Sequence, residues 1–223
     1  MSDVARILNA IQRGDVKAMR SEIYNYAWAT RRCWNNFEKP AIFGEAGIGN
    51  AFRGGSRGGR GAPGVQSPPT SGPSGFNLAY HNVIWASLSN GLAATPVWWT
   101  FRNLGPQDLL SLKCLSQFVS DIDLANLPYK PAPMSAEGAD ASGLATARAA
   151  FGWIWSYAKD NVGGTPLTVE GLTDGSFAVC WFDTWAGVIV KTENATSAAG
   201  RLSATVPDLS QAHRDIAYKI VKR

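Results

Sequence analysis

The side chains of this 223-residue chain that are best suited to chemistry are few and scattered. Its two histidines, His81 and His213, are isolated from each other and from any metal-ligand spacing. Asp121 and Asp123 form a close carboxylate pair, which we interpret as the solvated end of a helix. The GxxxxGK[ST], HExxH and CxxC patterns of nucleotide, zinc and redox sites are missing. The sequence therefore favours an enzyme least among the function classes, and we expect no catalytic residue, metal, cofactor or small-molecule substrate.

The second group of residues that could do chemistry is a set of arginines within a glycine-rich segment. The chain has a net charge of +4, and its positive excess lies within residues 1–60. Residues 44–75 hold 11 of the 23 glycines and include the run RGGSRGGRG. Such a segment cannot bury apolar surface and is predicted to be flexible. Its arginines, Arg53, Arg57 and Arg60, are candidates for binding RNA through charge, although an inert linker has the same composition.

Two charged residues stand in apolar surroundings of the C-terminal half. Asp183 lies in AVCWFDTWAGV, and Arg148 is the one charge between Ala141 and Ala158. A buried charge needs a partner, so the two can satisfy each other while the remaining arginine donors contact a phosphate. The alternative is that each faces solvent on its own helix. The tryptophans of this half sit among apolar neighbours and are expected to pack in the core: Trp153, Trp155, Trp181 and Trp185.

The elements that must position these residues are predicted to be helices. Apolar residues recur at three- and four-residue steps over 3–37 and 107–120, and Gly91 ends a predicted helix over 77–90. The pattern over 175–188 fits a strand or a helix, and we predict a helix because its neighbours are helical. Further helical segments are predicted at 95–103, 136–160 and 206–222.

These elements give a mainly α fold with a helical-bundle core. The expected organisation is an N-terminal helical arm (1–43), a Gly/Arg/Pro-rich flexible segment (44–75), an α-helical RNA-binding core (76–205) and a C-terminal helix or arm (206–223). No apolar run is long enough to span a membrane, and the N-terminus lacks the apolar region of a secretory signal. Three scattered cysteines fit a reducing compartment.

The C-terminal third resembles the coat proteins of flexuous filamentous positive-strand RNA viruses, the potexviruses among them. The segment FDTWAGV at 182–188 is similar to their FDFFNGV-type signature, and the WIW at 153–155 is similar to a W-N-W that precedes it. A proline-containing segment and an Ala-containing final stretch follow in the same order. The resemblance covers about 70–80 residues at the end of the chain. Each motif alone is unspecific, but their succession in the same order is more specific.

The resemblance implies an α-helical coat protein that polymerises around single-stranded RNA and binds its backbone without sequence preference. Asp183 would take the place of the family's aspartate, Arg148 that of its arginine, and Ser142 that of its serine. The implied locations are the virion and the host cytoplasm, with no membrane partner. A nucleoprotein of a segmented negative-strand RNA virus and a cellular RGG-type RNA-binding adaptor are the alternatives.

Overall fold

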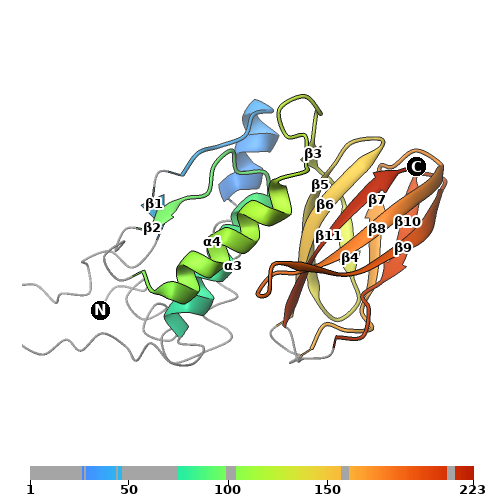
Figure 1. Cartoon of the computed structure of the whole chain (residues 1–223). Coiled ribbons are helices and arrows are strands. Elements are labelled where there is room, and N and C mark those ends of the chain that lie inside the picture. The colour runs from blue at the N-terminus through green and yellow to red at the C-terminus, as the bar shows by residue number, and fades with distance from the viewer. Residues whose placement is uncertain are drawn as a thin grey trace, which may run out of the picture.

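A computed structural model describes residues 27, 29–43, 45–46, 75–98, 104–156, 161–209 and 214–223. A large curled sheet lies on one side of the molecule and a pair of helices covers one of its faces (Figure 1). The helices are α3 (Gly75–Ser89) and α4 (Pro106–Val119), which we call the helical layer. Within these residues no helix is both long and apolar enough to cross a bilayer.

The curled sheet contains nine of the described strands in the order β3-β5-β6-β11-β8-β9-β10-β7-β4, and all its pairings are antiparallel. The last strand in the sequence, β11, lies in the middle between β6 and β8. The strands are β3 (Lys130–Pro131), β4 (Met134–Ala136), β5 (Asp140–Ala145), β6 (Ala149–Trp155), β7 (Pro166–Glu170), β8 (Gly175–Asp183), β9 (Val188–Ala198), β10 (Arg201–Thr205) and β11 (Asp215–Lys222).

The central strands are buried on both faces. On one face, Phe151 and Trp153 pack with Trp85 of α3 and Phe118 of α4. On the other face, Trp181 and Tyr218 belong to a second core enclosed by the curl of the sheet. A strand covered on both faces has no need of polar residues at alternate positions, and all seven residues of β6 are buried.

A second, two-stranded sheet accompanies the helical layer. β1 (Glu45–Ala46) and β2 (Val97–Trp98) pair in parallel, and α3 lies between them in the sequence. Residues 29–37 are also helical, and the Trp34 indole donates to the Gly91 carbonyl at 2.9 Å. Gly91 has φ of +87°, the left-handed conformation that glycine adopts most easily after a helix.

The structure corrects the predicted fold class. The helical-bundle core is wrong, because most described residues after Val119 form the curled sheet and not helices. The region predicted as a helix over 136–160 includes β5 and β6, and 175–188 includes β8. The last part of the predicted helix over 206–222 is β11. The predicted helical segment at 95–103 contains β2, and its residues 99–103 lie outside the described residues.

Three helix predictions are confirmed where the structure describes them: α3, α4 and the end of the N-terminal helix. The arm and the Gly/Arg-rich segment lie mostly outside the described residues. The boundaries at 43, 75 and 205 remain predictions, whereas the α-helical character assigned to 76–205 is corrected with the fold class.

Candidate functional site

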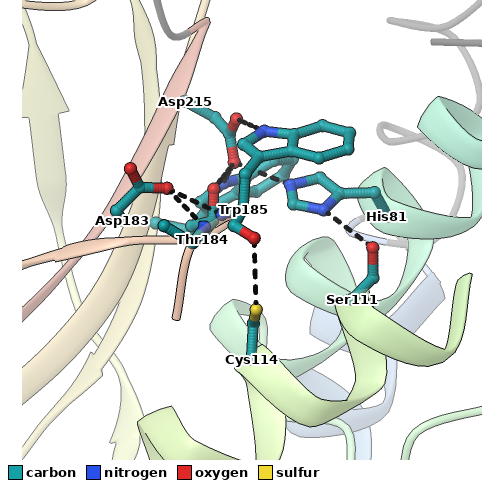
Figure 2. A network of polar contacts seen from close by, with 9 residues as sticks. His81, Ser111, Cys114, Asp183, Thr184, Trp185 and Asp215 are labelled. Carbon is teal, nitrogen blue, oxygen red and sulfur yellow. Dashed lines mark hydrogen bonds and ion pairs between the residues drawn. The ribbon is translucent and has the colours of Figure 1, made fainter. Parts of the chain in front are cut away.

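The most connected polar group in the described part of the chain is the carboxylate of Asp215, the first residue of β11. Its Oδ2 accepts hydrogen bonds from His81 Nε2 at 2.9 Å, Trp153 Nε1 at 2.7 Å and Thr184 Oγ1 at 2.7 Å. Its Oδ1 accepts one from Trp185 Nε1 at 2.8 Å. We call these five residues the Asp215 junction (Figure 2). Four donors from α3, β6 and the β8–β9 turn thus share one carboxylate.

His81 links the Asp215 carboxylate to the helical layer. Its ring is fully buried in α3 and stacks on the Trp185 indole, with 3.8 Å between centroids and 11° between planes. An ionised carboxylate only accepts hydrogen bonds, so we assign the shared hydrogen to His81 Nε2. The other ring nitrogen lies 3.4 Å from the Ser111 hydroxyl of α4. The ring therefore connects both helices to the sheet.

Asp183 shapes the turn that presents Thr184 and Trp185. Its Oδ1 accepts hydrogen bonds from the backbone nitrogens of Trp185 at 2.8 Å and Ala186 at 2.9 Å. The Trp185 carbonyl in turn accepts from the Cys114 thiol of α4 at 3.4 Å. A carboxylate at the start of a tight turn is a common way to satisfy the backbone donors of that turn. Asp183 thus holds the turn against the helical layer.

Electrostatics keep Asp215 ionised in spite of its burial. Burial by itself raises the pKa of a carboxyl group. The interaction with His81 and the hydrogen bonds from His81, Thr184 and Trp153 outweigh burial here, so that the pKa of Asp215 lies below its usual value. Removal of one of these donors would leave the buried charge incompletely compensated, which is strongly destabilising.

Two more polar contacts join the same layers. The hydroxyl of Ser142 on β5 lies 2.7 Å from the Ser89 hydroxyl and accepts from Asn90 Nδ2 at 3.3 Å, at the end of α3. Lys219 of β11, which is 9% exposed, forms an ion pair with Asp121 after α4. Together with the Asp215 junction, these contacts fix the helices on the sheet at three places.

Ser111, His81 and Asp215 lie in the order of a serine hydrolase triad, but the arrangement cannot act as one in this conformation. The three residues are 4%, 0% and 5% exposed, so a substrate cannot reach the Ser111 hydroxyl. The Trp185 indole also lies across the imidazole. Among the described residues, no group of three or more His, Cys, Asp or Glu could hold a metal ion. The arrangement joins layers and does not expose a reactive group.

The structure separates the residues that the sequence paired. Arg148 is exposed, and its carbonyl accepts from the backbone of Lys222, which lies opposite Phe177. Asp183 lies at the other end of β8, six residues away, which is about 20 Å along a strand. The two side chains therefore do not satisfy each other. Ser142 is buried at the helix contact, and Arg53, Arg57 and Arg60 lie outside the described residues.

Sequence reasoning missed the residues of the junction. His81 is isolated in the sequence because its partner lies 134 residues further on. One usable signal was the polar pair His81–Asn82 inside an apolar helix, since a buried polar side chain requires a partner. The prediction that tryptophans pack in the core is confirmed for Trp153, Trp155 and Trp181. Trp185 instead covers His81.

Comparisons with known proteins give a partial structural likeness. No protein-family model matches the chain, and no curated protein is similar to it. Among solved structures, one described as a glycoside hydrolase shows 11% identity and a TM-score of 0.42 over 64% of this chain. A GH30 endoxylanase from Clostridium papyrosolvens shows 16% and 0.43 over 67%, and a glycoside hydrolase family 30 subfamily 8 xylanase from Clostridium acetobutylicum shows 12% and 0.37 over 66%.

These findings correct the functional predictions. The resemblance to a coat protein is wrong, because the residues that carry it form strands of a curled sheet: WIW ends β6 and FDTWAGV spans the β8–β9 turn. The predicted encapsidation of RNA is wrong with it, as are the nucleoprotein and RNA-adaptor alternatives. The prediction that the chain is not an enzyme is also withdrawn: the solved structures to which the chain is partly similar are described as glycoside hydrolases.

The likeness assigns neither a family nor an activity to this chain, because the TM-scores lie below 0.5. The matched region spans 37–38% of the length of those proteins. Self-association and localisation, which the coat-protein resemblance implied, remain predictions without that support.

Proposed function

We propose that the described part of the chain is a supporting module, in which the curled sheet holds the helical layer and its parallel β1–β2 pair in a fixed position. The observation that carries this proposal is the Asp215 carboxylate. It accepts hydrogen bonds from α3, from β6 and from the β8–β9 turn at distances of 2.7–2.9 Å. Several directional hydrogen bonds to one carboxylate are satisfied in only one relative position of the layers, whereas apolar contacts alone allow the layers to shift slightly against each other.

The arrangement of the layers agrees with a supporting role. Parallel strand pairs with a helical connection are typical of α/β layers that are covered on their faces. Here α3, which connects such a pair, is buried from Tyr80 to Ala86, and its side chains pack on Phe151 and Trp153 of the sheet. The sheet thus provides the surface on which this α/β layer rests. No reaction is assigned to the described residues.

The proposal is tested by the cooperativity of unfolding. The wild-type chain and the Asp215→Asn variant are unfolded in urea, with ellipticity at 222 nm reporting the helices and near-ultraviolet ellipticity the aromatic residues of both cores. We expect one shared transition for the wild type and two separate transitions for the variant. Separate transitions already in the wild type would show that the sheet does not hold the helical layer.

A further inference from the structure

A polar groove opens where strands β9 and β10 separate. The two strands pair only beside their connecting turn, at Arg201–Ala198 and Leu202–Ser197. Beyond these pairs β9 continues along β8, and β10 continues along β7. A hollow of 410 Å³ lies between them, and we call it the fork groove. Its volume falls within the range of about 300–1,000 Å³ that is usual for ligand sites.

The fork groove offers donors and acceptors of several kinds. Its polar lining comprises Lys191, Glu193, Asn194, Ser203, Thr205 and Asp208. Within the described residues, the facing backbone edges of β9 and β10 have no strand partners beyond Ser197 and Leu202. Small apolar surfaces from the partly exposed Ala195, Ala204 and Pro207 lie beside the polar groups. A ligand that fills this groove must donate, accept and also present apolar surface.

One carboxylate in the groove is already oriented. Glu193 Oε1 accepts from Trp181 Nε1 at 2.8 Å, and its Oε2 lies 2.6 Å from Lys191 Nζ. Burial raises the pKa of Glu193, but the hydrogen bonds from Lys191 and Trp181 lower it by more than burial raises it. The pKa of Glu193 therefore lies below its usual value. The groove thus contains a fixed, ionised acceptor whose side chain is still 25% exposed. A preoriented acceptor of this kind reduces the entropy that a ligand loses on binding.

Charge narrows the class of ligand. Among the described residues that line the groove are one lysine and two carboxylates, so that their formal charge is −1, and the lysine is already paired with Glu193. Phosphates and other anions would be repelled. An extended peptide is a weaker fit, because β9 and β10 diverge and a straight strand can pair with only one of them. Hydroxyl groups donate and accept from the same atom and suit this mixed lining.

We propose that the fork groove binds a neutral, polyhydroxylated ligand, of which an oligosaccharide is the chemical class that fits. Vicinal hydroxyls donate to Glu193 and Asp208 and accept from Asn194 and Thr205, while the carbon faces of the sugar rest on Ala204 and Pro207. This site goes beyond the supporting role proposed above and does not depend on it. None of the described residues that line the groove is aromatic, so the expected affinity is modest, with a Kd of about 0.1–1 mM.

The test is a calorimetric titration of the full chain with cellotetraose and maltotetraose as neutral probes. Tetragalacturonate serves as the anionic probe, and an uncharged extended octapeptide as the peptide probe. We expect one neutral saccharide to bind, and both Glu193→Gln and Thr205→Ala to weaken it by about tenfold or more. Thr196→Ala is the matched control, because this exposed residue lies on β9 and does not line the groove.

Several outcomes overturn the proposal. They are no heat from either neutral saccharide at about 10 mM, tighter binding of the peptide or the anion, and unchanged saccharide binding in both groove variants. The two variants lie on different strands, so that misfolding of one, seen by circular dichroism, leaves the other as the test. Failure here leaves the coupled unfolding of the layers unaffected, because the groove contains no residue of the Asp215 junction.

Discussion

Replacing Asp215 by asparagine is the sharpest perturbation of the junction. The variant keeps the shape of the side chain and removes its charge. An amide has one acceptor oxygen in place of two, so that if this oxygen takes the place of Oδ2, its nitrogen faces the Trp185 indole N–H. The substitution thus weakens three hydrogen bonds and sets two donors against each other in a buried site.

The expected loss of stability follows from these contacts. Hydrogen bonds to charged groups contribute about 1.5–3 kcal/mol and neutral ones about 1 kcal/mol, so loss of the charge costs roughly 0.5–2 kcal/mol for each of three bonds. An unsatisfied buried donor costs about 1–3 kcal/mol more. We therefore expect Asp215→Asn to lower the free energy of unfolding of the helical layer by at least about 2.5 kcal/mol, a range that includes the 3–5 kcal/mol typical of removing one partner of a buried pair.

The urea transition of the helical layer, followed by ellipticity at 222 nm, measures this loss. The matched control is Asp123→Asn, because Asp123 accepts two hydrogen bonds from Asn126 at an exposed position. We expect the control to lose less than about 1 kcal/mol. A loss below about 1 kcal/mol for Asp215→Asn would refute the reasoning.

The remaining predictions concern pH, a single donor and a crowded glycine. The pKa of Asp215 in the folded chain is below its pKa in the unfolded chain, so the ionised carboxylate stabilises the fold fully above about pH 4. This stabilisation is lost as the pH falls through the lower pKa of the folded state. Unfolding free energies of the wild type measured at decreasing pH should show this fall, and those of Asp215→Asn should lack it. Thr184→Val removes one of the four donors to the charged carboxylate and should cost about 1.5–3 kcal/mol in urea unfolding, less than Asp215→Asn; an equal cost would contradict a shared acceptor. Gly152→Ala places a methyl group against the Ser142 carbonyl and the Tyr218 hydroxyl and should cost more than about 2 kcal/mol; a thermal melt unchanged from wild type would contradict this close packing.

The sequence predicts the helical layer better than the sheet. Leu109, Leu112 and Leu115 recur at helical spacing in α4, and Gly91 follows α3, so both helices follow from local signals. The strands in the middle of the sheet lack such a signal. β6 is apolar at every position because both of its faces are covered, and a continuous apolar run does not distinguish a buried strand from a buried helix.

β8 did contain a strand signal that the helical interpretation of its neighbours overrode. Phe177, Val179 and Trp181 alternate with less buried residues and point into the enclosed core. The Asp215 junction was beyond prediction from one sequence, because its residues are brought together only by the pairing of β11 between β6 and β8. Local patterns can indicate that His81 needs a partner, but not which carboxylate supplies it.

Native-state hydrogen exchange tests the coupling of sheet and helical layer most directly. Mass spectrometry of peptides from residues 80–89, in α3, and 151–155, in β6, gives the opening free energy of each layer in the wild type and in Asp215→Asn. We predict equal opening free energies in the wild type and a selective decrease for α3 in the variant. Unequal values in the wild type, or an equal decrease in both peptides of the variant, would contradict the role of Asp215 in holding the helical layer on the sheet.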